Sequence, residues 1–438
     1  MIRDRLRRLA HEALHRIEEE RDASQLQVFT APWVLPGAPT PIRDGAVVVD
    51  SDGCVLACGP RADILPRFQW AHHAELDGIL MPGLVDARAQ LELGDLRGEI
   101  PQGLGLTRKL RALREVRKAT ESLDPDSREA QIRASVRRSV AAGTAAVGDV
   151  TSSLRPVPSM AREGLYGVAF HEIEGFSKRK AAKALAAAAV QRAGIVPWPE
   201  GIAYRLAPHS VYSTASSVVT DLVSKALKQG VVTAIRLAEA EEELDLFEAG
   251  GSAASALLDA VGRVWDEHRP HASDPLAYLE QLGALNQQVM LVHMTAATRG
   301  MAQRASRAGA PVVLTPRADL HVGERLPPLV SFLEEGCRIA LGTDSPASSP
   351  EQSVLREAAE LHAAFPEVPS LVLIDAATRG GADALGIDGM GSLEPGTSPG
   401  LLFADTNGRT PNDPAGWLLE QANPSLQWLV RPAPPAAA

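Results

Sequence analysis

The sequence predicts an α/β protein built on a (β/α)8 TIM barrel, with a small β-sandwich formed by both ends of the chain. Eight short apolar runs alternate with longer stretches rich in Ala, Arg and Leu, which is the pattern of parallel strands separated by helices. The runs lie at 79–87, 143–150, 165–172, 202–208, 231–239, 288–293, 310–315 and 337–344. Strand and turn patterns before and after these runs, at 26–62 and 391–405, indicate the sandwich.

Five segments follow from these patterns. Residues 1–24 place apolar side chains at helical spacing, which predicts an amphipathic helix that either docks a partner subunit or packs on its own domain. Residues 25–78 and 388–430 are expected to form the composite β-sandwich, and 79–387 the barrel. The Pro- and Ala-rich end, 431–438, is expected to be disordered.

Composition excludes several classes of protein. With 45% hydrophobic and 22% charged residues, the chain of 438 residues can bury a large core. It has no apolar run of about 18 residues and no secretory signal, so we expect a cytoplasmic protein without a membrane partner. A net charge of −10 argues against nucleic acid, and three cysteines are too few for a disulfide scaffold.

Ionisable and polar side chains stand where the barrel strands end. Catalytic groups of a barrel project from the C-terminal ends of its strands and from the loops that follow. Taken in order, these positions carry Arg88, Gln90, Glu172, His209, Arg236, Glu239, His293 and Asp344. The set predicts a functional site at this face of the barrel.

Seven segments carry a resemblance to a known family. They are MPGLVDARAQLEL, APHSVYS, IRLAEAEEE, LVHM, LTPRADL, ALGTDSPAS and GSLEPGTSPGLLFAD, in order over residues 26–410. Together they resemble the amidohydrolase superfamily, and most of all its chlorohydrolase and deaminase branch. The resemblance implies a metal-bearing barrel whose metal-activated water hydrolyses carbon–nitrogen bonds other than peptide bonds.

The sequence departs from the metal site that this resemblance implies. The family holds its metal with a His-x-His pair after strand 1, a His after strand 5 and an Asp after strand 8. Here the three histidine positions carry Arg88, Gln90 and Arg236, and only Asp344 matches. A guanidinium offers donors alone and cannot ligate a cation, so we expect no metal cofactor.

Other positions of the family pattern are retained. Glu239 matches a proton-shuttling Glu, His293 a His that supports the leaving group or oxyanion, and His209 a His that contacts substrate. With Asp344, Glu239 and His293 are therefore the candidate catalytic residues. The alternative is that they are leftovers of descent, because a proton shuttle has little to do without an activated water.

Charge balance suggests what replaces the metal. Arg88 and Arg236 bring two positive charges to a site where Glu239 and Asp344 bring two negative ones. Since a buried carboxylate needs a cation or a proton, we expect Asp344 to pair with Arg88 or Arg236.

A second interpretation treats the same arginines as ligand contacts. Unpaired, Arg88 and Arg236 would form a clamp for a carboxylate or phosphate, with Gln90 and His209 as further substrate-binding residues. A further alternative is a metal site relocated to some of the other histidines, which are His72, His73, His268, His271 and His321.

Two functions from different classes remain open. The first is a pseudoenzyme or metal-free anion-binding protein of the deaminase lineage, acting alone, as a homodimer or with an active paralogue. The second is an active hydrolase or deaminase of carbon–nitrogen bonds that uses a rebuilt or metal-independent site with Glu239, His293 and Asp344. The expected ligand is a small anionic or amine-bearing molecule.

Overall fold

A computed structural model describes residues 26–435, apart from 38–39, 122–123, 248–251, 262–271, 324 and 422–423. The predicted N-terminal helix, 1–24, lies outside the described residues. Of the predicted tail, 431–435 are described, and there Arg431 donates to the carbonyl oxygen of Glu163 at 2.7 Å.

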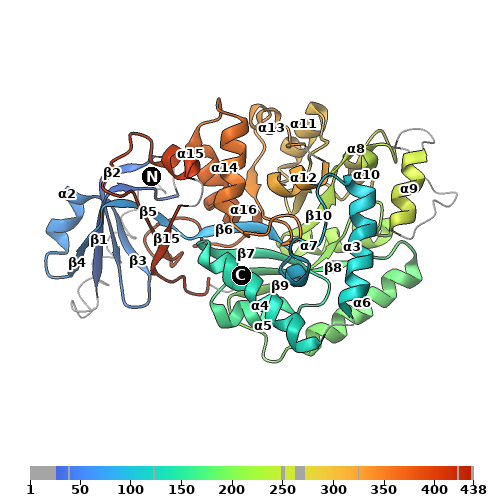
Figure 1. Ribbon diagram of the computed structural model, residues 1–438, viewed down its shortest axis with the longest axis horizontal. Helices are drawn as coiled ribbons and strands as arrows, with labels where there is room; N and C mark the ends of the chain where they lie inside the picture. The colour runs from blue at the N-terminus through green and yellow to red at the C-terminus, as the bar shows by residue number, and fades with distance from the viewer. Residues whose placement is uncertain are drawn as a thin grey trace.

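Eight parallel strands form the centre of the molecule, in two sheets of four (Figure 1). The first sheet has the order β6(Leu84–Ala89), β7(Thr144–Thr151), β8(Tyr166–Ile173), β9(Ile202–Pro208), and the second β10(Thr233–Leu237), β11(Val289–His293), β12(Val312–Leu314), β13(Ile339–Leu341). Isolated bridges join Ala89 to Asp344 and Ser210 to Arg236, so the edges of the two sheets approach each other at the site described below.

Helices follow these strands and cover them on the outside (Figure 1). They are α3(Gly105–Glu121), α4(Pro125–Ala141), α5(Pro156–Glu163), α6(Lys178–Ala193), α7(Ser216–Gln229), α8(Glu241–Leu244), α9(Ser252–Ala260), α10(Pro275–Gln281), α11(Arg299–Ala308), α12(Pro316–Gly323), α13(Leu329–Glu334), α14(Val354–Ala364), α15(Ser370–Ala376) and α16(Arg379–Leu385), with the 3-10 segment η3(Leu91–Leu96) after β6.

Local sequence explains where several helices begin. The side chain of Asp124 accepts a hydrogen bond from the backbone of Ser127 at the start of α4, and Asp274 does the same at the start of α10. In both helices a proline follows the capping residue, where its missing N–H costs nothing. Two of the strands, β7 and β10, are buried along their whole length.

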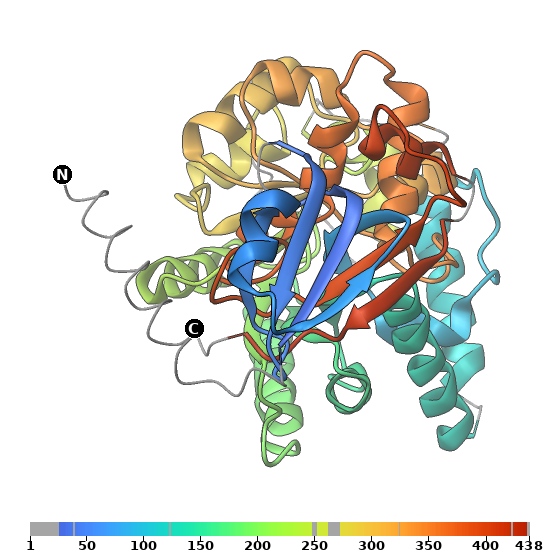
Figure 2. The ribbon, with the colours of Figure 1, turned by 90° about the vertical axis from the view of Figure 1, so that its left-hand side faces the viewer.

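Strands from both chain ends form a further sheet, which Figure 2 shows in front of the barrel strands. Its order is β15(Leu426–Val430), β14(Leu401–Asp405), β5(Gly78–Pro82), β1(Gln27–Val34), β2(Ile42–Val49), β3(Val55–Pro60), with β4(His72–Glu75) paired to β1 and with α2(Arg61–Ile64), η2(Leu65–Arg67) and α17(Pro414–Glu420) beside it. The expected contribution of both ends is present, but among the described residues the strands pair as one seven-stranded sheet, and the sandwich of two sheets is not confirmed.

The first predicted strand, 79–87, is in fact two strands in different sheets. Its first half is β5, which pairs antiparallel with β14, and its second half begins β6, which pairs parallel with β7. Gly83 separates them at a point where a Cβ atom would lie 2.5 Å from the Cβ of Ala145. The prediction of a single strand was wrong because a continuous apolar run does not reveal which sheet each residue faces.

Candidate functional site

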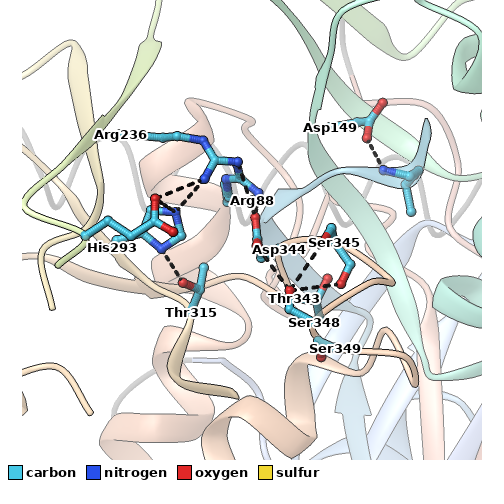
Figure 3. Close-up of polar contacts among 12 residues, drawn as sticks. Arg88, Asp149, Arg236, His293, Thr315, Thr343, Asp344, Ser345, Ser348 and Ser349 are labelled. Carbon is cyan, nitrogen blue, oxygen red and sulfur yellow. Dashed lines mark hydrogen bonds and ion pairs between the residues drawn. The ribbon is translucent and has the colours of Figure 1, made fainter. Parts of the chain in front are cut away.

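The predicted site residues converge where the barrel strands end (Figure 3). Arg88 lies in β6, Arg236 in β10 and His293 at the end of β11, while Asp344 follows β13. Glu239 stands just after β10. All five side chains are buried.

Asp344 is held by arginine, as the charge balance predicted. Arg88 Nη1 forms an ion pair with Asp344 Oδ1, and Arg236 Nη2 lies 3.6 Å from the same oxygen. Ser348 donates its hydroxyl to Asp344 Oδ2 at 3.2 Å. Burial, helped by the charge of Arg236, lowers the pKa of Arg88 to about 9, which still leaves it protonated at neutral pH.

Glu239 is surrounded by three nitrogen-bearing side chains. Arg236 Nη1 donates to Glu239 Oε2 at 3.2 Å, Lys109 Nζ donates to Oε1 at 3.1 Å, and His293 Nε2 lies 3.6 Å from Oε2. Burial by itself raises the pKa of Glu239, but the charges of Lys109 and Arg236, with His293 close by, bring it well below its usual range. Glu239 is therefore an ionised carboxylate at neutral pH.

Lys109 is a site residue that the sequence reasoning missed. It comes from α3, and its Nζ also lies 3.8 Å from Asp344 Oδ2, so one ammonium group bridges both carboxylates. Its helical spacing to Leu106 and Leu113 places it on the inward face of α3. A lysine on an apolar helical face was the signal that could have found it.

His293 is positioned by a carboxylate and a hydroxyl on its far side. Nδ1 lies 3.0 Å from Asp319 Oδ1 and 2.8 Å from Thr315 Oγ1, and Nε2 lies 3.2 Å from Arg236 Nη1. Because a guanidinium only donates, Nε2 accepts and the ring proton sits on Nδ1. Burial lowers the pKa of His293, although Glu239 opposes the shift, so we assign it as neutral.

Backbone strain is concentrated at the same strand ends. Ala238, His293 and Asp344 adopt φ angles of 48°, 75° and 56°, in the left-handed region that side-chain-bearing residues rarely occupy. Such conformations persist where surrounding structure imposes them, and they cluster at functional sites.

A cavity of about 360 Å³ lies beside these groups. The predicted substrate-binding residues Gln90, His209 and Arg236 line it together with Lys109 and Glu172. His209 Nδ1 is hydrogen-bonded to the Ser213 hydroxyl at 2.6 Å. Arg88, which was also predicted to bind substrate, is not among the residues that line the cavity; it is paired with Asp344 instead.

The residues present do not fit a divalent metal ion. Arg88 and Arg236 are donor-only cations beside Asp344, and Gln90 is a weak oxygen ligand. Within the described ranges no group of three or more His, Cys, Asp or Glu side chains is arranged to hold a metal. His268 and His271, two of the histidines considered for a relocated metal site, lie outside the described residues.

Comparison with known proteins defines the class. The model of the amidohydrolase family matches residues 79–428, and the chain belongs to that family. The aminodeoxyfutalosine deaminase of Deinococcus radiodurans is 28% identical over 376 residues, which cover 80% of this chain and 83% of that protein. A 5-methylthioadenosine/S-adenosylhomocysteine deaminase of Nitratidesulfovibrio vulgaris is 26% identical over 393 residues, covering 86% and 81%.

Solved structures support the fold. The aminofutalosine deaminase of Helicobacter pylori, in complex with methylthio-coformycin, superposes with a TM-score of 0.79 at 16% identity. The match covers 94% of this chain and 100% of that one. The eight parallel strands therefore belong to a TIM-barrel-type fold. Among the described residues, no helix has the length and apolar character needed to cross a membrane.

Proposed function

We propose that this protein is a metal-independent, ligand-binding member of the deaminase-related amidohydrolases, a pseudoenzyme with respect to metal-dependent hydrolysis. The observation that carries the proposal is the contact of Arg88, Arg236 and Lys109 with the carboxylates of Asp344 and Glu239. These three cations neutralise buried carboxylates that would otherwise require a metal or a proton.

The same contacts leave little freedom for hydrolysis. A general base must be free to take a proton from water, yet each oxygen of Glu239 accepts from a cation. Nε2 of His293 is engaged by Arg236, whose Nη1 lies 3.2 Å away. A water molecule beside Glu239 and His293 would have no metal ion to activate it. It would also find no free general base to accept its proton.

The cavity favours an anionic ligand. Its lining carries five cationic side chains, Lys109, Arg114, Arg117, Lys118 and Arg236, against two acidic ones, Glu172 and Glu174. Lys109 and Arg236 already contact Glu239, and the remaining three cations still outnumber the two acidic side chains. His209 and Gln90 add polar contacts, so a small carboxylate- or phosphate-bearing molecule fits this lining, and an amine would be restricted to the side of Glu172.

Metal counting tests the proposal. The protein is purified without chelators from medium supplemented with zinc and iron, and metal atoms per chain are measured by elemental mass spectrometry. We expect less than about a tenth of an equivalent, together with saturable binding of oxalate as a small anionic probe. About one equivalent of metal that disappears in Asp344→Ala would contradict it.

A second candidate is an active hydrolase or deaminase of carbon–nitrogen bonds. It is favoured by the names of the relatives and by the proximity of Glu239 to His293. The test is ammonia release from 5-methylthioadenosine, compared between the wild type and Glu239→Gln. Turnover that the substitution abolishes would select this function over the first.

Location and assembly belong to the same proposal. We propose a cytoplasmic protein that pairs with a second copy or with an active paralogue. Size-exclusion chromatography with light scattering measures self-association directly.

A further inference from the structure

A second cavity, of about 320 Å³, lies away from the site described above. It is formed between the segment that follows β6 and the helix α4, and its lining shares no residue with the first cavity. The lining residues are Gly94, Arg97, Glu99, Ser127, Arg128, Gln131 and Arg138. Nothing in the proposed function uses this cavity.

Positive charge dominates the second cavity. Three arginines, Arg97, Arg128 and Arg138, face one acidic residue, Glu99, in a protein whose overall charge is negative. Burial and then the charge of Arg97 lower the pKa of Arg138, so the two guanidinium groups are close enough to repel each other. An arrangement of this kind costs free energy unless an anion lies between the like charges.

Arg138 also has donors without acceptors. Its Nε and Nη2 atoms are buried and have no hydrogen-bond partner among the described residues. The neighbouring Arg137 differs, because its Nε donates to Glu163 Oε1 at 2.8 Å. Buried donors left unpaired are unfavourable, so these atoms point to an acceptor that the protein itself does not supply.

We propose that this cavity binds a tetrahedral oxyanion of the phosphate or sulfate class, either the free ion or the terminal group of a small phosphomonoester. Guanidinium groups present paired N–H donors in a fork that matches two oxygens of such an ion. Arg138 supplies this fork, and Arg97 and Arg128 add charge around it.

Neighbouring stretches of chain line the two cavities. Ile100 lines the first cavity, whereas Arg97 and Glu99, a few residues earlier, line the second. Arg97 Nε donates to the carbonyl oxygen of Pro350 at 3.0 Å, in the loop that also carries Ser348 of the first cavity.

Isothermal titration calorimetry with inorganic phosphate at low ionic strength tests this proposal. We expect saturable binding to the wild type, weakened about tenfold or more in Arg138→Gln and also reduced in Arg128→Gln. The matched control is Arg137→Gln, which removes the same charge from the next residue and should leave the affinity nearly unchanged. Equal weakening in Arg137→Gln and Arg138→Gln would mean general electrostatics and would overturn the site.

Two further measurements test which cavity binds the ion and whether the ligand is the free ion or a phosphomonoester. Arg114→Gln alters the first cavity only. If the Arg114→Gln variant lost phosphate binding and the Arg138→Gln variant kept it, the ion would bind in the first cavity and the proposal would be overturned. Glycerol phosphate distinguishes the two sources: tighter binding than inorganic phosphate indicates a phosphomonoester, and equal or weaker binding indicates the free ion. Thermal unfolding of each variant checks that the fold is retained.

Discussion

Asp344 is a buried carboxylate that lies beside three cationic side chains. One oxygen is shared by Arg88 and Arg236, and the other receives Ser348 and lies near Lys109. The sequence predicted that Asp344 pairs with Arg88 or Arg236, because the charges at the strand ends can be counted from the local sequence alone. It could not predict Lys109, since contact between α3 and the strand ends depends on tertiary packing.

Removal of Arg88 should destabilise the fold. Arg88→Met leaves Asp344 buried with Arg236 at longer range, and the expected loss is about 3 kcal/mol in the free energy of unfolding, measured by urea titration. The double variant Arg88→Met/Asp344→Leu should recover part of that loss, because no unpaired carboxylate remains. Arg137→Ala, which breaks a largely exposed pair, should cost less than about 1 kcal/mol. Equal losses in the free energy of unfolding for Arg88→Met and Arg137→Ala would show that the buried pair stabilises the fold no more than the exposed one.

Lys109 should affect ligand binding more than Lys118 on the same helix. Both line the first cavity, but Lys109 is buried against Glu239, whereas Lys118 is exposed and pairs with Glu115. Lys109→Met should weaken oxalate binding about tenfold, because a charge-assisted contact is lost, and calorimetry measures the change. Lys118→Met is the control, and a larger effect there would place the anion at the mouth of the cavity instead.

At the scale of elements, the strand order was predictable and the sheet boundaries were not. The alternation of short apolar runs with helical segments predicted the eight parallel strands, because the spacing and length of apolar runs are local properties of the sequence. The division of 79–87 between β5 and β6, and the pairing of both chain ends in one sheet, depend on partners far away in the chain. The pairing of His293 with Asp319 was missed for the same reason.

Close contact between β6 and the end of β13 gives a prediction at this scale. A Cβ atom at Gly342 would lie 2.6 Å from the carbonyl oxygen of Arg88 and 2.8 Å from its Cβ. Gly342→Ala should therefore separate the two strands, displace the Arg88–Asp344 pair and cost about 1–3 kcal/mol in chemical denaturation. At Gly323 a Cβ would meet nothing within 4 Å, so Gly323→Ala should be tolerated. Similar stability of the two variants would show that the strands can separate without cost.

At the scale of the whole molecule, buried acids control how stability depends on pH. Burial raises the pKa of Asp86 to about 7 and those of Asp149, Glu243 and Glu357 to about 8. In the unfolded chain these four acids release their protons near pH 4, so between about pH 4 and pH 8 they bind more protons in the folded state than in the unfolded state. Stability should therefore fall as the pH rises through this range.

The pH prediction has a direct measurement. Urea midpoints should be higher at pH 5.5 than at pH 8.5, and Glu357→Gln should reduce the difference, because a neutral amide cannot lose a proton. Glu172 and Glu239 act in the opposite direction, because their pKa values are lowered in the folded state. The stability that they contribute is lost only as the pH falls below about 4. A midpoint that rises steadily from pH 5.5 to pH 8.5 would contradict the prediction.

The network of Arg88, Arg236 and Lys109 also has a consequence for evolution. Each cation contacts a buried carboxylate, so the loss of any one by a single mutation leaves negative charge without its neighbour before a replacement can arise. A change that brings a metal-binding side chain to one of these positions would therefore need further changes at the others to keep the buried charges balanced.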